Sequence, residues 1–232
     1  MIKLENCEVM GWEAAIRGMR NPLNSWGKSD SGLSYISPTN IRWGDSITQV
    51  EGGTTEFCLG PNDFDLMTRL RNAGTDHRKF MRMITVYLDI TAPLYWWKEF
   101  DTYKVGTVAN SCSTMHKIAD KEFTLDDFSC EHLENSWLAH LKNTIKLLNK
   151  ARDAYNWCNT CVKKEWWWRI IQLLPSSYNQ RRTVMLNYEV LANIYKSRKD
   201  HRLDEWRDFC KWIETLPYSE LITGDISEKE KK

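Results

Sequence analysis

The sequence lacks several features that would place it in a common class of protein. No stretch approaches the eighteen or more uninterrupted apolar residues of a membrane-spanning helix, and the opening MIKLENCEVM lacks the regions of a signal peptide. Neither sign of charge dominates, because 32 Lys and Arg residues face 31 Asp and Glu residues. No overall field therefore favours nucleic acid or an anionic membrane. These absences predict a cytoplasmic protein that binds neither nucleic acid nor a membrane.

The motifs of widespread enzyme classes are absent as well. The chain has no GxxxxGK[ST] loop, no GxGxxG between a strand and a helix, no GxSxG and no HExxH. His132 and His140 lie eight residues apart, whereas metal-binding pairs on a helix prefer a spacing of three or four. We therefore expect neither a hydrolase, a kinase nor a nicotinamide enzyme, and no metal site.

Seven cysteines, an odd number, are scattered along the chain and indicate free thiols in a reducing compartment. Cys158 and Cys161 form a single CxxC, which we interpret as structural. A zinc site would need two further ligands at matching spacing, and a redox motif would need a strand-to-helix turn.

Twelve tryptophans are the most unusual part of the composition. Five of them are consecutive in two clusters, Trp96 and Trp97, then Trp166, Trp167 and Trp168. Consecutive helical residues point about 100° apart, so these clusters are too wide for one buried face. We expect some of the rings to reach a second subunit or to cover a ligand.

The length and the 42% hydrophobic content favour one compact unit. Strands are expected at 2–8, 81–90 and 103–108, and helices at 10–20, 61–72 and from Leu125 onward. An irregular segment at 21–60, with room for a short strand pair, is typical of a lid or binding loop. We predict a single domain over residues 1–224, followed by a disordered charged tail at 225–232.

The stretch LNYEVLANIYKSR in the last third of the chain is the most informative. Its apolar residues follow the period of a buried helical stripe: Leu186, Val190, Leu191, Ile194 and Tyr195. Asn187, Asn193 and Arg198 do not belong to that stripe. Amides can read the edge of a planar ring and a guanidinium offers a fork of donors, so these three could hold a heterocycle or an anion. Ordinary surface polarity is the alternative.

The spacing of these residues resembles the C-terminal segment of the flavin-dependent thymidylate synthases. Asn187 follows Pro175 by twelve residues, Asn193 comes six later and Arg198 five after that, without a gap. The resemblance implies that Arg198 is the catalytic residue that polarises the pyrimidine of dUMP, and that Asn187 and Asn193 bind the flavin. The following LDEWRD needs a one-residue insertion to bring Trp206 into the family pattern.

The family signature, Arg-His-Arg-x-x-Ser-x-Asn-Glu-x-Ser-x-Arg-Tyr, falls on YKVGTVANSCSTMH at residues 103–116, which we name the signature segment. Asn110 and Ser113 match it, which implies a flavin-binding Asn110 and a substrate-binding Ser113. The signature's arginines fall on Tyr103, Val105 and Met115, and its histidine falls on Lys104. Lys104, Lys117 and Lys98 could replace those arginines in part, as point charges at the substrate. Arg181 and Arg182 are the best spare guanidinium groups for the same role.

His77 lies where the family carries a histidine near the flavin, with Asp76 in place of the family's glutamate. The resemblance therefore implies a cofactor-binding His77, and an ordinary turn residue is the alternative.

The resemblance further implies an α+β fold with a small, mostly antiparallel sheet packed with a long helical C-terminal half. It implies FAD as the cofactor, a pyrimidine nucleotide as the substrate, a folate as the one-carbon donor and a homotetramer with sites between subunits. The leading hypothesis is a flavin-dependent thymidylate-synthase-like methyltransferase. A catalytically inactive relative that binds or sequesters a nucleotide, and a purely structural oligomer, remain as alternatives.

Overall fold

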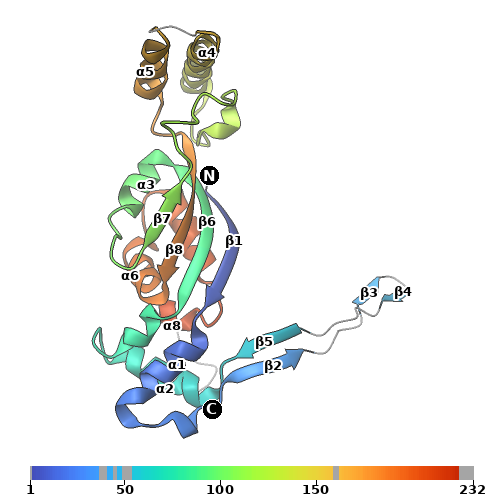
Figure 1. Ribbon diagram of the computed structural model, residues 1–232, viewed down its shortest axis with the longest axis vertical. Helices are drawn as coiled ribbons and strands as arrows, with labels where there is room; N and C mark the ends of the chain where they lie inside the picture. Colours follow the sequence, from blue (N-terminus) through green and yellow to red (C-terminus); the bar gives the residue numbers. More distant parts are fainter. Residues whose placement is uncertain (1, 37–40, 44–45, 49–53, 159–161, 225–232) are drawn as a thin grey trace.

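The computed structural model describes residues 2–36, 41–43, 46–48, 54–158 and 162–224, so the expected tail at 225–232 lies outside the described residues. Its centre is a four-stranded antiparallel sheet in the order β1, β6, β8, β7 (Figure 1). These strands are β1 Lys3–Met10, β6 Thr85–Pro93, β7 Val108–Ser111 and β8 Asn179–Asn187. The expected α+β fold with a small antiparallel sheet and a long helical C-terminal half is confirmed.

The described chain also contains eight α-helices and four short 3-10 turns. The helices are α1 Trp12–Arg20, α2 Pro61–Asn72, α3 Leu94–Phe100, α4 Asn135–Trp157, α5 Lys163–Leu173, α6 Tyr188–Arg198, α7 Asp204–Ile213 and α8 Glu220–Thr223. The 3-10 turns are Asn21–Leu23, Trp26–Lys28, Arg78–Arg82 and Leu125–Asp127. Helix α2 starts at Pro61, as expected, because proline's missing N–H costs nothing in a first turn. None of the described helices combines the length and the apolar character needed to cross a membrane.

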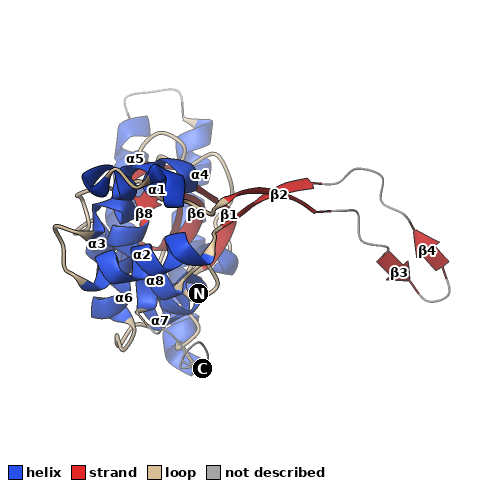
Figure 2. Ribbon diagram, turned by 90° about the horizontal axis from the view of Figure 1, so that it is seen from below, coloured by secondary structure: helices blue, strands red, loops and turns tan. Residues whose placement is uncertain are grey.

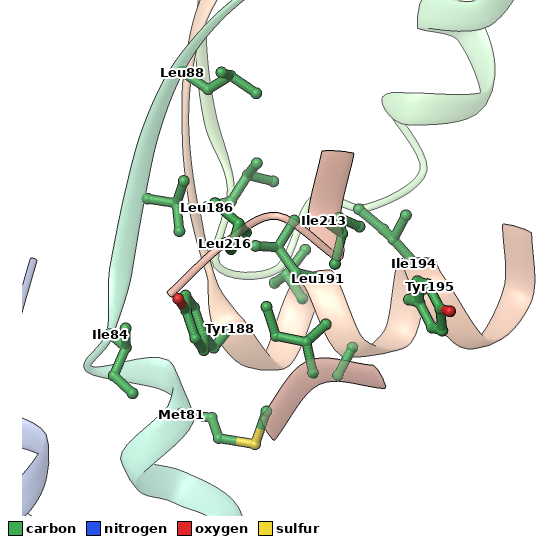
Figure 3. Packing of buried hydrophobic residues seen from close by; sticks show 14 of the residues in the cluster. Met81, Ile84, Leu88, Leu186, Tyr188, Leu191, Ile194, Tyr195, Ile213 and Leu216 are labelled. Atoms are coloured by element: carbon green, nitrogen blue, oxygen red, sulfur yellow. The ribbon is translucent and has the colours of Figure 1, made fainter. Parts of the chain in front are cut away.

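Helices cover one face of the sheet, and the main core lies between these helices and the sheet. Alternate residues of β6 and β8 point into it, among them Leu88 and Leu186. Figure 3 shows Leu191 and Ile194 of α6 packed beside Ile213 at the end of α7. Fully burying such a side chain contributes about 1.5–3 kcal/mol, which fixes α6 against the sheet.

Helices α4 and α5 form a hairpin beyond one end of the sheet, with a core of its own (Figure 1). Leu141, Ile145 and Leu148 of α4 face Ile170 of α5 and form a buried stripe at helical spacing. The sequence predicted a helix from Leu125, but α4 begins only at Asn135. Thr124 and Asp127 form a capping box on the 3-10 turn before it, which closes that turn locally.

The segment at 21–60 contains two strand pairs, and Figures 1 and 2 show them as an arm that projects from the body. Strand β2 Gly32–Ile36 pairs with β5 Thr54–Cys58, and β3 Ile41–Trp43 pairs with β4 Ser46–Thr48. The short strand pair that the sequence allowed in this segment is therefore present twice.

Other expectations were wrong in detail. A 3-10 turn over Arg78–Arg82 replaces the first part of the expected strand at 81–90, and β6 begins only at Thr85. The strand expected at 103–108 begins only at Val108, because Gly106 takes a left-handed φ of 78°. Leu186 belongs to β8, a strand that the sequence did not predict, and α6 begins at Tyr188.

Trp96 and Trp97 are both buried inside their own chain, so the expectation that such a pair must reach outside was wrong for them. Short α3 is covered on two sides. Trp97 donates to the carbonyl of Gln180 in β8, and the ring centroid of Trp96 lies 4.6 Å from that of Trp206 in α7. In the second cluster Trp168 is 45% exposed, as expected for a ring that does not fit one buried face.

Candidate functional site

The signature segment runs beside both β8 and α6. At its start, Arg198 Nε donates to the hydroxyl of Tyr103 at 3.0 Å. Further along, Asn187 Nδ2 donates to the carbonyl of Gly106 at 3.4 Å, and β7 then pairs with β8. The structure therefore joins the two parts of the chain that carry the family resemblance.

Asn187 is the N-cap of α6, where its Oδ1 accepts from the amide of Val190 at 3.0 Å. An Asn cap of this kind stabilises a helix by about 1 kcal/mol. Gly106 approaches closely, since a Cβ on it would lie 2.7 Å from Asn187 Nδ2. Asn187 thus orients the signature segment as well as the start of α6.

Arg198 lies at the end of α6 and contacts α3 and the signature segment. Its Nη1 donates to Glu99 Oε2 at 2.7 Å, and the ring of Trp206 lies 4.9 Å from the guanidinium carbon. Lys104 directly follows Tyr103, is exposed, and has no ion pair with any described residue. Arg198 and Lys104 are therefore the candidate cations on this side of α6.

Asn193 points away from that side, toward the 3-10 turn Arg78–Arg82. Buried Glu189 binds both Arg78, at 3.2 Å, and Arg82. Arg78 Nη2 in turn donates to Asn193 Oδ1 at 3.4 Å, and exposed His77 is the residue before Arg78. We call Arg78, Arg82, Glu189 and Asn193 the Glu189 cluster. It links Asn193 to Arg78, the residue that follows His77.

Electrostatics keep the carboxylate of this cluster charged. Burial raises the pKa of Glu189, but the hydrogen bonds and charges of Arg82 and Arg78 outweigh it and lower the pKa below the usual range. Glu189 therefore anchors two guanidinium groups beside His77.

Arg181 and Arg182 lie on opposite faces of β8, because side chains alternate along a strand. Arg182 faces the helices, where it bonds Asp101 at 2.7 Å and lies 4.1 Å from the ring of Trp97. Arg181 lies on the other face, 2.7 Å from Asp89. The two expected substrate arginines are thus separated, and each already has an acidic partner.

Asn110 shares the face of Arg181. It pairs across the sheet with Thr183, whose hydroxyl donates to Asp89. Hydrogen bonds from Thr183, Asn6 and Arg181 hold the pKa of Asp89 well below its usual range, so this carboxylate stays ionised. Within one chain Asn110 does not meet Asn193 or Arg198.

Ser113 lies in a tight turn after β7. Its hydroxyl accepts from the amides of Met115 and His116 at 3.2 and 3.1 Å. Val105 and Met115, which replace two signature arginines, are 91% and 49% exposed. Both side chains are therefore open to solvent within one chain.

Two cavities adjoin other parts of the described chain. One open cavity of about 820 Å³ lies beside Arg20 and Asn62, and another of about 600 Å³ lies beside Arg152 and Trp157. Neither is lined by the candidate residues. No three His, Cys, Asp or Glu side chains of the described chain are grouped as a metal site would need. Cys158 is free, and Cys161 lies outside the described residues.

Sequence reasoning missed Glu99, Glu189 and Arg78. Arg82 lies 107 positions from Glu189, and Arg198 lies 99 from Glu99, so no local pattern marks these pairs. Only the run HRKFMR, with its three cations next to His77, offered a signal for the Glu189 cluster.

No protein-family model matches this sequence, and no curated protein matches it. Solved structures do match it, among them two crystal structures of thymidylate synthase X (ThyX) from Helicobacter pylori, both with FAD and dUMP. The first has a TM-score of 0.63 at 14% sequence identity, covering 97% of this chain and 98% of that chain. The second has a TM-score of 0.61 at 14% identity, with 96% and 98% covered. The protein therefore has the fold of the flavin-dependent thymidylate synthase ThyX.

Proposed function

We propose that this protein is a flavin-dependent thymidylate-synthase-like enzyme that binds FAD and a pyrimidine nucleotide and methylates a uridylate. The observation that carries the proposal is the contact of the signature segment with α6, where Tyr103 meets Arg198 and Gly106 meets Asn187. The ThyX structures of the same fold hold FAD and dUMP. Fold alone does not assign an activity, so the proposal rests on these contacts.

The Glu189 cluster fits the diphosphate of FAD. Arg78, Lys79 and Arg82 supply three cations within five residues, against the single buried carboxylate of Glu189. About a quarter of the Arg78 side chain and half of the Arg82 side chain are exposed, so donors remain for a ligand. In this proposal His77, Asn110, Asn187 and Asn193 complete the cofactor site.

When bound, reduced FAD supplies the hydride that converts a transferred one-carbon unit into a methyl group. The protein's own residues bind and orient the reactants. Arg198 polarises the pyrimidine, and Lys104 and Ser113 bind the sugar phosphate. Arg181 and Arg182 would have to leave Asp89 and Asp101 to take part, which makes Lys104 the better candidate for the phosphate.

A second copy of the chain would complete the site, because Asn110 and Arg198 do not converge within one chain. We propose a homotetramer, in which the sheet face that carries Asn110 and Arg181 meets another subunit. A folate is the proposed one-carbon donor.

Turnover tests the proposal directly. The purified chain is incubated without oxygen with dUMP, a folate one-carbon donor, FAD and a reductant, and dTMP is measured. The proposal expects dTMP, lost on Arg198→Ala and retained on Arg169→Ala, a matched arginine of α5 that pairs with Glu165. Absence of dTMP from a preparation that binds both FAD and dUMP would overturn the methyltransferase assignment.

The alternative function is an inactive relative that binds a nucleotide without converting it. The pairing of Arg198 with Glu99 favours this alternative, because a neutralised guanidinium polarises a ring less strongly. Binding of dUMP without product would identify it.

A further inference from the structure

Glu99, in the last turn of α3, contacts both the end of α6 and the residues that follow it. Its Oε2 accepts from Arg198 Nη1 at 2.7 Å and from Trp206 Nε1 at 2.9 Å, and it lies 3.4 Å from His201 Nε2. Trp206 is fully buried, so this carboxylate is tied to the core although 35% of its side chain is exposed. Glu99 is therefore a preorganised acceptor at the surface of the proposed nucleotide site.

Arg198 is held equally firmly. Its Nε donates to Tyr103, and its guanidinium carbon lies 4.9 and 5.8 Å from the ring centroids of Trp206 and Tyr103. Only 19% of the side chain is exposed. Within the described chain, Arg198 Nη2 and Glu99 Oε1 have no hydrogen-bond partner.

The pair offers a ligand one donor and one acceptor without a net charge. A phosphate that approached Arg198 would also meet the carboxylate of Glu99, and like charges a few ångströms apart repel. A neutral ring edge with an N–H beside a carbonyl satisfies both groups, since its N–H donates to Oε1 and its oxygen accepts from Nη2. The N3 edge of a uracil has this pattern.

We infer that Glu99 is a specificity-determining residue of this site: together with Arg198 it selects a pyrimidine with a free N3–H and excludes phosphate from this position. This inference rests on the proposed function and names the group that recognises the substrate's base. Both residues are needed for this recognition, since Arg198 alone would bind either a carbonyl or an anion.

Binding measurements on the full chain in the presence of FAD test the inference. Calorimetry compares dUMP, N3-methyl-dUMP and inorganic phosphate on the wild-type protein and on Glu99→Gln. A hydrogen bond to a charged group predicts that wild type prefers dUMP over its N3-methyl analogue by about tenfold or more. Glu99→Gln should remove most of that ratio and strengthen competition by phosphate.

Tyr103→Phe is the matched control, because it removes the other hydrogen-bond partner of Arg198 and leaves the carboxylate in place. It should weaken dUMP binding and preserve the preference over the N3-methyl analogue. An equal ratio in wild type and Glu99→Gln would overturn the inference. If Glu99→Gln does not fold, the wild-type measurement is sufficient by itself: equal binding of dUMP and N3-methyl-dUMP by wild type would overturn the inference. If wild type binds no nucleotide at all, the proposed function fails as well. Loss of the preference and loss of all binding therefore distinguish failure of the inference from failure of the proposed function.

Discussion

Asp63→Asn should destabilise the protein strongly, because Asp63 is fully buried and neutralises buried Arg20. Two nitrogens of Arg20 lie 2.6 Å from Asp63 Oδ1. The other oxygen, Oδ2, accepts from the hydroxyls of Ser29 and Ser31, both at 2.7 Å. Removing one partner of a buried pair costs about 3–5 kcal/mol, since the other charge stays buried without compensation. At about 2–4 °C per kcal/mol for a chain of this size, Tm should fall by about 6–20 °C.

Thermal unfolding followed by circular dichroism measures this effect. Asp65→Asn is the matched control, because Asp65 lies on the same helix and pairs with Arg69 at the surface, where a pair contributes about 0–1 kcal/mol. Adding Arg20→Leu to Asp63→Asn should recover part of the loss. The reasoning is refuted if Asp63→Asn and Asp65→Asn shift Tm equally.

Three further effects follow from the site. Gly106→Ala should cost about 1–2 kcal/mol, because φ is 78° and the new Cβ would press on Asn187; denaturant unfolding checks it, and Gly27→Ala, with open space around it, should cost nothing. Asn187→Ala should cost about 1 kcal/mol by removing the α6 cap, whereas Asn187→Ser should retain most of the stability in the same assay. The pKa of Glu189 is lowered in the folded state, so its stabilisation is present at neutral pH and is lost on acidification through that pKa. Below about pH 5, Tm should therefore fall less steeply with pH in Glu189→Gln than in wild type. An equal slope in both proteins would contradict the stabilising role of the Glu189 cluster.

Local patterns were sufficient for several elements. The bounds of α2 follow from Pro61 and from the Ala73-Gly74 stop, and the stripe that includes Leu191 and Ile194 predicted α6. Both signals lie within one or two turns of the chain, which is the range over which propensity and capping act.

Strand β8 was missed because Arg181 and Arg182 interrupt its apolar pattern. Arg182 lies over the ring of Trp97 and pairs with Asp101, 81 positions away. Trp96 and Trp97 were misjudged for the same reason, since β8 and α7 cover both sides of α3. Partners that are distant in sequence decide these environments, and a single sequence does not show them.

The candidate site was predicted in part. Arg198 and Asn187 both contact the signature segment, and Arg78, the residue after His77, donates to Asn193. Their acidic anchors Glu99 and Glu189 were not predicted. The roles assigned to the site residues, the single domain and the homotetramer stay predictions.

Visible absorbance of the purified protein during titration with FAD tests the central claim most directly. The account predicts a bound flavin spectrum and saturable binding. Arg78→Ala should weaken that binding by about tenfold or more through loss of a charge-assisted contact, whereas Arg169→Ala on α5 should not. The account would be contradicted if the spectrum of the mixture equalled the sum of the spectra of the protein and of free FAD at every FAD concentration.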